Sequence, residues 1–331
     1  MQALVYTGPK TLELRDTPHP VARNGDALIK IDSVGICGSD LHAWAGHDAR
    51  RTPPLILGHE AAGTIVGGPE AGLPVTVNPL VTCGTCRDCE AGRNNLCEAR
   101  EIISMAPREG AFTEYLTMPW DNLSYVNCTA TLEQAALAEP IACGWHAVRV
   151  ARRAMKSGLC ESRCLVLGGG AIGLGASLVL AAHGAREIWI GETNPLRHPF
   201  LESSGDFRVF DPSSDVGPGE NSVDLVVDAV GIEATRVTAS QCVRAGGVIA
   251  HIGLGSPSGG LDIRRLTLQE ITFLGTYTYA PRDFRETTRA IYDGRLGSLD
   301  WMDVRPLSDG PRSFEEISTG KAATPKILLK P

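Results

Sequence analysis

The chain has 331 residues and a formal net charge of −7 at pH 7. This length suggests two domains of ordinary size, and the negative charge argues against a nucleic-acid-binding protein, which needs a surplus of Lys and Arg. No apolar run reaches the roughly 18 residues of a membrane-spanning helix, and the N-terminus lacks the basic and apolar regions of a secretory signal, so we expect a cytoplasmic protein with neither a nucleic-acid nor a membrane partner.

The chain from its N-terminus to about residue 132 is rich in Gly, Pro and short β-branched runs. Turn signals separate these runs, as in a compact all-β unit. The strands expected in it lie at 26–34, 64–66, 75–77 and 112–118.

Two short segments of this unit carry potential metal ligands. One reads GICGSDLH and contains Cys37 and Asp40, and the other reads GHE and contains His59 and Glu60. A catalytic zinc needs about three N, S or O ligands and one open position; the later Glu139 offers a further oxygen, and Asp40 could accept the second ring proton of the histidine. Taken one at a time, such residues are more often core or loop residues than metal ligands. The prediction of a catalytic zinc therefore depends on the motifs that follow.

A cluster of cysteines comes next, with the spacing C-x2-C-x2-C-x7-C. Four thiolates so close in sequence can surround one ion tetrahedrally and leave no open position, which predicts a structural zinc that organises a lobe. The alternatives are an iron–sulfur cluster and four free thiols, although exposed free thiols would be a redox liability. The predicted ligands are Cys83, Cys86, Cys89 and Cys97.

Beyond residue 132 the pattern changes to helices and strands. Helices are expected at 132–138 and 141–154. From residue 163 strands alternate with helices, which predicts a parallel sheet covered by helices. The expected strands are 164–167, 187–190, 208–210, 224–227, 248–252 and 326–329, and the expected helices are 171–183, 195–203, 234–243 and 282–292.

A glycine-rich turn lies between the strand 164–167 and the helix 171–183, and it matches G-x-G-x-x-G. In this context the motif predicts dinucleotide binding, because glycines let the backbone approach a pyrophosphate and the helix N-terminus offers free N–H groups. The alternative is a turn that only packs helix on strand. The residues expected at the cofactor are Gly168, Gly170, Ala171, Ile172 and Gly173.

The choice between NAD and NADP depends on Glu192, which stands about 20 residues after the glycine turn. A carboxylate there can accept hydrogen bonds from the adenosine ribose and would repel a 2′-phosphate, so NAD is predicted. Arg197 lies close by in the sequence and could favour the phosphate.

Together these motifs resemble those of the zinc-dependent medium-chain dehydrogenases, and most of all the polyol branch with sorbitol, 2,3-butanediol and L-threonine 3-dehydrogenases. The resemblance covers essentially the whole chain. It implies an α/β protein with a GroES-like β-rich catalytic domain at 1–138, completed by 285–331, that carries both zinc sites. It also implies a Rossmann NAD-binding domain with a doubly wound parallel sheet at 139–284.

The resemblance implies roles for individual residues. Cys37, His59 and Glu60 match the catalytic-zinc residues, and Glu139 matches an acidic residue that ligates the metal directly or through water. A hydroxyl and an imidazole that form a proton relay correspond to Ser39 and His42. Further cofactor contacts are implied for Val230, Gly253, Leu254 and Thr276.

Three departures from the family pattern stand out. The link between Phe210 and Val223 is short and rich in Pro and Gly, so one crossover helix should be missing. The stretch 67–77 is also short and lacks the usual Pro-Gly-Asp turn. Thr278 falls where sorbitol dehydrogenases carry an arginine, which argues against sorbitol itself as the substrate.

The implied function is the zinc- and NAD-dependent oxidation of a secondary alcohol of a polyol, sugar or cyclitol to the ketone, by hydride transfer to nicotinamide. An amino-alcohol or short-diol dehydrogenase is the alternative within enzymes. A non-catalytic NAD-binding structural or regulatory protein is the alternative of another class, and it should have lost catalytic ligands. The resemblance also implies two Zn²⁺ per chain and a homo-oligomer, either a dimer or a tetramer.

Overall fold

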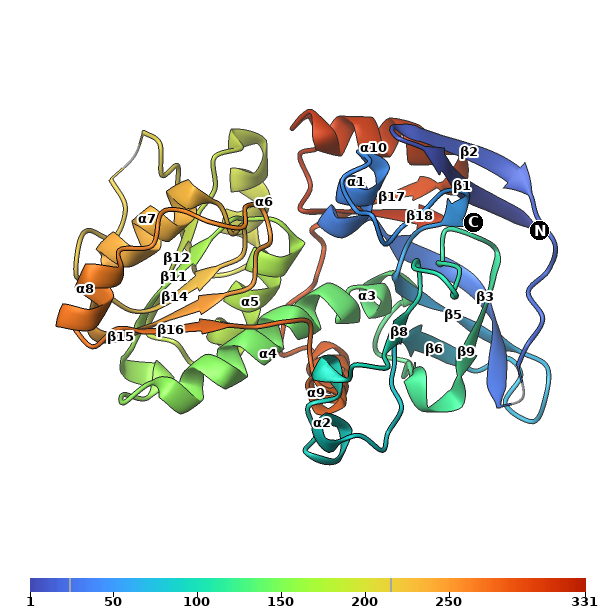
Figure 1. Ribbon diagram of the computed structural model, residues 1–331, viewed down its shortest axis with the longest axis horizontal. Helices are drawn as coiled ribbons and strands as arrows, with labels where there is room; N and C mark the ends of the chain where they lie inside the picture. Colours follow the sequence, from blue (N-terminus) through green and yellow to red (C-terminus); the bar gives the residue numbers. More distant parts are fainter. Residues whose placement is uncertain (24, 215) are drawn as a thin grey trace.

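The computed structural model describes residues 1–23, 25–214 and 216–331. Two bodies lie side by side in Figure 1, one rich in β-strands and one with a central sheet flanked by helices, and helix α4 (Ala138–Ala154) runs between them. This arrangement confirms the predicted fold class. No helix in the described part of the chain is long and apolar enough to cross a membrane.

The β-rich body is built on a sheet with the strand order β10-β6-β5-β3-β18-β17, and β9 also pairs with β3. A smaller sheet has the order β2-β1-β4. The bounds are β1 Gln2–Gly8, β2 Thr11–Asp16, β3 Asp26–Gly35, β4 Leu55–Ile56, β5 Glu60–Val66, β6 Pro74–Val77, β9 Tyr115–Pro119, β10 Leu123–Tyr125, β17 Met302–Pro306 and β18 Lys326–Lys330.

Strands β17 and β18 come from the end of the chain, and they complete this sheet. The ladder between β18 and β3 pairs Leu328 with Gly35 and Leu329 with Val34. Helix α10 (Gly310–Ser318) adds Phe314, whose ring lies 5.9 Å from those of Trp44 and Phe112 in the core. The C-terminal segment therefore lies beside the residues that directly follow β3, which include Cys37.

Strand β5 is longer than predicted and starts at Glu60. The extra residues, from Glu60 to Gly63, belong to the strand because they pair with β3. At Gly63 the two strands lie so close that a Cβ would be 2.2 Å from the carbonyl oxygen of Lys30. In contrast, the strand predicted at 112–118 begins only at Tyr115, since the Phe112 amide bonds instead to the Leu57 carbonyl oxygen at 3.0 Å.

The second body holds a parallel sheet with the order β13-β12-β11-β14-β15-β16. The order reverses at β11, and in such sheets a crevice opens at the carboxyl ends of the strands beside that point. The bounds are β11 Arg163–Leu167, α5 Ala171–Ala182, β12 Glu187–Gly191, α6 His198–Ser203, β13 Arg208–Phe210, β14 Val223–Asp228, α7 Glu233–Cys242, β15 Val243–His251, α8 Ile263–Leu268, β16 Thr272–Gly275 and α9 Pro281–Tyr292.

Two sequence-based expectations about helices have clear outcomes. The described residues of the β13–β14 link, 211–214 and 216–222, contain no helix, so the shortened crossover is confirmed there. The helix predicted at 141–154 starts earlier, at Ala138, because Pro140 lies in its first turn, where a missing backbone N–H costs no intrahelical hydrogen bond. This early start places Glu139 on α4, which follows the short helix α3 (Leu132–Ala136).

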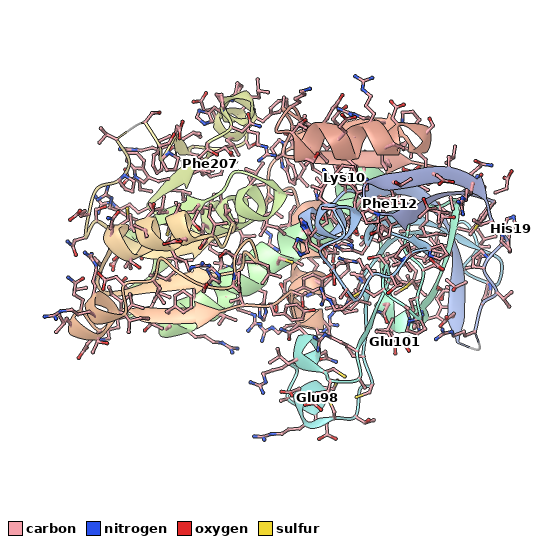
Figure 2. All side chains as sticks on the ribbon, turned by 45° about the horizontal axis from the view of Figure 1, so that its top comes forward. Lys10, His19, Glu98, Glu101, Phe112 and Phe207 are labelled. Carbon is pink, nitrogen blue, oxygen red and sulfur yellow. The ribbon has the colours of Figure 1, made fainter. Side chains whose placement is uncertain are left out.

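A short irregular lobe carries the four cysteines. It contains β7 (Leu80–Val81), α2 (Arg87–Glu90), the 3₁₀ turn Asn94–Leu96 and β8 (Glu101–Ile102). Figure 1 shows α2 close to α9, and in Figure 2 Glu98 marks the same lobe at the edge of the molecule.

Candidate active site and metal centres

Three potential ligands from the β-rich body meet beside the β3–β5 pair. The ligand atoms of Cys37, His59 and Glu60 all lie within 4.8 Å of one another. The ladder brings them together, because Gly35 at the end of β3 pairs with Glu60 at the start of β5. A thiol, an imidazole and a carboxylate are a donor set that fits a zinc ion.

Asp40 lies beneath this cluster and is fully buried. Its Oδ1 is 3.3 Å from His59 Nδ1, and its Oδ2 accepts a hydrogen bond from the Cys37 amide at 3.0 Å. Burial disfavours the charged carboxylate, but the charges of His59 and Arg51 outweigh it and lower the pKa of Asp40. A carboxylate in this position fixes the orientation of a ligating imidazole.

Glu60 has a partner that the sequence analysis missed. Lys326 Nζ donates to Glu60 Oε1 at 2.7 Å, to Glu60 Oε2 at 2.6 Å and to the Ile36 carbonyl oxygen at 2.9 Å. Both side chains are buried, so each charge compensates the other where water cannot. The two residues are 266 positions apart in the sequence, so no local sequence pattern could predict this pair.

Glu139 lies outside the three-residue group, because among the described residues its carboxylate does not meet the same 4.8 Å limit. Tyr279 donates a hydrogen bond from its hydroxyl to Glu139 Oε1 at 2.9 Å. Burial raises the pKa of Glu139 to about 7, and the charges of His59 and Glu60 also act on it, which shows that it belongs to the same neighbourhood.

The two residues implied for a proton relay both lie on α1 (Gly38–Trp44). Ser39 contacts the buried Arg51, which donates to the Ser39 carbonyl oxygen at 2.9 Å and to its Oγ at 3.4 Å. His42 stands one turn further along and is exposed, with its ring 5.3 Å from that of His47. The helix thus leads from a half-buried hydroxyl to an imidazole in contact with solvent.

The four cysteines of the lobe have sulfur atoms within 4.8 Å of one another. Cys83 and Cys89 are 3.9 Å apart, and Cys97 and Cys83 are 3.6 Å apart. Four ligands at the usual zinc–sulfur length form a tetrahedron with edges of about 3.8 Å. The cysteines therefore fit a single zinc ion, and they lie too close together to enclose a cluster of several iron atoms. Backbone hydrogen bonds from Thr85 and Cys86 lower the pKa of Cys83 to about 6, which favours its thiolate.

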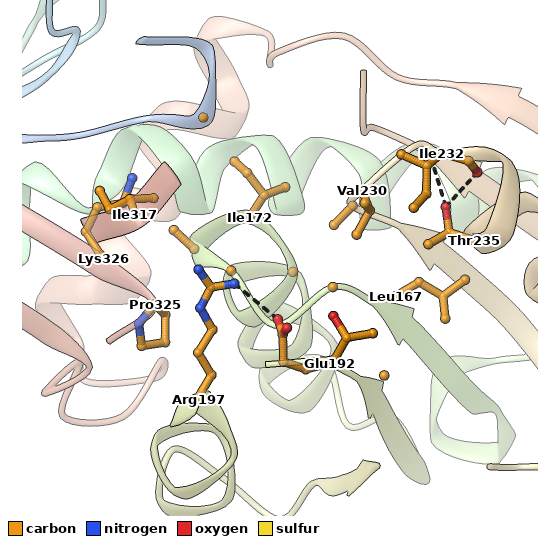
Figure 3. A pocket seen from close by; sticks show the side chains of 18 of the residues that line it. Leu167, Ile172, Glu192, Arg197, Val230, Ile232, Thr235, Ile317, Pro325 and Lys326 are labelled. Atoms are coloured by element: carbon orange, nitrogen blue, oxygen red, sulfur yellow. Dashed lines mark hydrogen bonds and ion pairs between the residues drawn. The ribbon is translucent and has the colours of Figure 1, made fainter. Parts of the chain in front are cut away.

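A cavity of about 660 Å³ separates the two bodies. One wall carries Cys37, Glu60 and Lys326, and the other carries the glycine turn and Glu192. Figure 3 shows Pro325 and Lys326 from the chain's end on one side, opposite Ile172 and Val230.

Three of the four glycines between residues 168 and 173 are suited to their positions for different physical reasons. Gly168 has φ +96, a conformation that side chains disfavour. A Cβ at Gly173 would lie 1.8 Å from the Gly168 carbonyl oxygen, so only glycine allows this contact between helix and strand. Gly170 caps α5, and no described residue has an atom within 4 Å of where its Cβ would be. That open space in front of a helix N-terminus fits the pyrophosphate of a dinucleotide.

Glu192 is held rigidly at the edge of this cavity. Its Oε2 accepts hydrogen bonds from the Gly169 amide at 2.8 Å and from Arg197 at 3.3 Å, and its Oε1 accepts one from the Asn194 amide at 2.7 Å. Figure 3 shows the contact between Arg197 and Glu192. The arginine that could have favoured a phosphate is therefore already paired with a carboxylate.

The other predicted cofactor residues divide into two groups. Ala171, Ile172 and Val230 line the cavity. Gly253, Leu254 and Thr276 are not part of its wall among the described residues; Leu254 is 83% exposed, and the Thr276 amide donates to the His251 carbonyl oxygen at 2.9 Å. A cofactor contact for these three stays a prediction.

Comparisons with known proteins agree with this architecture. Residues 23–127 match the family model of the alcohol dehydrogenase GroES-like domain, and residues 171–293 match that of the zinc-binding dehydrogenases. The chain is 33% identical to L-galactonate-5-dehydrogenase of Escherichia coli K12 over 89% of its length and 88% of the relative. It is also 33% identical to sorbitol dehydrogenase of Bacillus subtilis 168, over 100% and 97% of the two chains. The solved structure of acetophenone reductase from Geotrichum candidum in complex with NAD superimposes with a TM-score of 0.88 at 25% identity, covering 100% of this chain and 97% of that one.

Proposed function

Because this chain belongs to the zinc-binding dehydrogenases of the medium-chain superfamily, we propose that it oxidises a secondary alcohol of a polyol, sugar or cyclitol to the ketone, with NAD as the hydride acceptor. The observation that carries this proposal is the cavity between the two bodies. A candidate zinc cluster lies on one of its walls, and the glycine turn of a dinucleotide site lies on the other.

The proposed metal content is two zinc ions per chain. Cys37 and His59 would hold the catalytic ion, with Glu60 or Glu139 as a further oxygen donor, and the four-cysteine lobe would hold the structural one. The catalytic ion, when bound, supplies a Lewis acid for the alcohol oxygen, and NAD supplies the acceptor for the hydride.

The protein's own groups orient the substrate and move its proton. Ser39 accepts the proton of the reacting hydroxyl as it passes its own proton on, and His42, which is exposed, releases a proton to water. Asp40 keeps His59 in place, and Lys326 keeps the negative charge of Glu60 compensated.

The experiment is a measurement of NAD reduction with a panel of polyols, cyclitols, aldoses and aldonic acids, before and after treatment with a chelator. We expect turnover of at least one hydroxyl-rich substrate and its loss with the metal. Turnover only of amino alcohols or short diols would favour the alternative enzyme. Absence of turnover despite NAD binding and full metal content would support a non-catalytic protein.

The chain's assembly and its domain limits also belong to the proposal. The first domain would comprise 1–138 and 285–331, and the pairing of β18 with β3 supports this return of the chain. Strand β16 is at the edge of its sheet, where it pairs only with β15 among the described residues, and it leaves Phe273 36% exposed. An open strand edge of this kind can pair with another chain, so we place the contact of a homodimer there.

A further inference from the structure

We propose that Asn95, in the four-cysteine lobe, is a positioning residue for the active site. It holds the segment 277–279 in the conformation in which Tyr279 donates its hydrogen bond to Glu139. This inference rests on the proposed function, because it assigns the lobe a part in catalysis as well as in folding.

Two residues of the lobe contact Tyr277. Asn95 is 3% exposed, and its Nδ2 donates to the Tyr277 carbonyl oxygen at 2.8 Å across 182 residues of sequence. The guanidinium carbon of Arg100 lies 5.1 Å from the centre of the Tyr277 ring, and Arg100 also donates to the Cys97 carbonyl oxygen at 2.8 Å. Both contacts come from residues beside Cys97, so the metal ligands and Tyr277 are fixed by one structure.

The segment 277–279 has a backbone conformation that its own residues do not favour. Thr278 has φ +45, which is costly for a β-branched residue, and its Oγ1 is buried without a hydrogen-bond partner among the described residues. A backbone in this region persists only when its surroundings determine it. Asn95 supplies such a constraint on one side of Thr278.

On the other side, the chain leads directly to the catalytic cluster. Tyr279 is 1% exposed, its ring stacks on Phe284 at 5.6 Å, and its hydroxyl bonds to Glu139 at 2.9 Å. A displacement of Tyr277 would therefore move a group that contacts a carboxylate of the active site. Loss of the Asn95 contact should therefore disturb the placement of Tyr279 against Glu139 and reduce catalysis.

The test compares Asn95→Ala with Asn94→Ala in the zinc-loaded full chain. Asn94 is a matched control, because its side chain donates to Thr82 Oγ1 at 3.2 Å and stays within the lobe. In Asn95→Ala we expect faster hydrogen–deuterium exchange over 276–284 and a fall of about tenfold in kcat/KM for the alcohol. The zinc content, the melting temperature and the KM for NAD should stay as in the wild type. Asn94→Ala should match the wild type in every measurement.

A double-mutant cycle with Tyr279→Phe shows whether Asn95 acts through this tyrosine. With the hydroxyl gone, Asn95→Ala should change kcat/KM by less than about twofold, because the two residues act in series. Equal losses in both backgrounds would overturn the proposal. If Asn95→Ala loses zinc or melts early, Asn95→Leu takes its place, since it keeps the approximate size of the side chain and removes the donor without adding a buried charge.

Hydrogen–deuterium exchange separates this inference from the proposed function, because it needs no turnover. Unchanged exchange over 276–284 in both Asn95 variants would overturn the positioning role. A wild-type protein that oxidises no alcohol would contradict the proposed function, and the exchange data would still decide whether the lobe holds the segment.

Discussion

Lys326 and Glu60 form an ion pair whose side chains are 3% and 0% exposed. Removing one partner of such a pair leaves the other charge buried and uncompensated, and this usually costs about 3–5 kcal/mol. Lys326→Met should lower the free energy of unfolding by an amount in that range, as measured by urea denaturation. Lys330→Met is the control, because Lys330 lies on the same strand but is 38% exposed, and surface pairs contribute less than about 1 kcal/mol. Equal losses in the two variants would show that Glu60 finds other compensation.

The two groups of candidate metal ligands should respond differently to the same substitution. Cys37→Ser should reduce kcat by at least about 100-fold, because changing a residue that only supports a metal ligand can already reduce activity about 100-fold. The melting temperature of this variant should change little. Cys97→Ser should instead lower the melting temperature and release one metal ion per chain. Near-normal turnover in Cys37→Ser would refute the catalytic assignment, and wild-type melting of Cys97→Ser would refute the structural one.

Cofactor preference provides a third residue-scale prediction. Glu192→Ala removes the carboxylate that both repels a 2′-phosphate and pairs with Arg197. The freed guanidinium can then bind that phosphate, so the ratio of kcat/KM for NAD to that for NADP should fall about tenfold or more. The double variant Glu192→Ala with Arg197→Ala should not gain activity with NADP. An unchanged ratio in the single variant would show that Glu192 does not recognise the adenosine ribose.

Residues whose neighbours in space are also neighbours in sequence could be predicted from local patterns, whereas Cys37, His59, Glu60 and Glu139 were found as one site only through the family resemblance. The four cysteines and the three motif glycines each lie within one short stretch, so the cysteines are predicted by their spacing and the glycines by their spacing between a strand and a helix. The partners of Glu60 and Glu139 could not be predicted, because Lys326 and Tyr279 stand 266 and 140 positions away from them. Such pairs exist only once distant parts of the chain have packed together.

At the scale of elements, helices α4 and α9 are joined by a buried network around Asp283. His146 Nδ1 lies 2.7 Å from Asp283 Oδ2, Arg149 bonds to both carboxylate oxygens, and the Ala280 amide donates to Oδ2 at 3.1 Å. Burial opposes the charged form, but the hydrogen bonds from His146 and Arg149 outweigh it. They lower the pKa of Asp283 from 3.8 to about 2.

This depressed pKa predicts a pH-dependent stability. A carboxyl whose pKa is lower in the folded state contributes stability above its unfolded pKa of 3.8, and the contribution is lost as the pH falls toward 2. Asp283→Asn should therefore unfold more easily than the wild type by about 2 kcal/mol at pH 7, and the difference should shrink between pH 4 and pH 2. Urea denaturation across this range checks it. Asp293→Asn, just past the other end of α9, is the control, because the Asp293 carboxylate lies on the surface, 3.7 Å from Arg295.

Element types were easier to predict than element ends. The alternation of strands and helices predicts the parallel sheet, because hydrophobic periodicity is a local property. The ends depend on tertiary contacts. Strand β15 starts at Val243, five residues before the expected 248, because its first residue already pairs with Val223 on β14.

At the scale of the whole molecule, the site forms only because the last strand of the chain packs against the first domain. Strand β18 returns to β3, and this brings Lys326 to the cavity wall that also carries Cys37 and Glu60. The site is therefore assembled from the start, the middle and the end of the chain, between two bodies. A change that detaches the C-terminal strand should disturb the metal cluster and the cofactor cavity together.

The exposed edge of the parallel sheet leads to a prediction about assembly. If β16 pairs with its counterpart in a second chain, a charge at Phe273 would be buried in the contact and would oppose it. Phe273→Asp should shift the protein toward the monomer, with at least about a tenfold weaker dimer, as measured by light scattering after gel filtration across a concentration series. Val304→Asp is the matched control, because Val304 is 43% exposed on β17, at the edge of the other sheet. A monomer produced by Val304→Asp alone would move the contact to the β-rich body, and a wild-type monomer at every concentration would remove the proposed dimer.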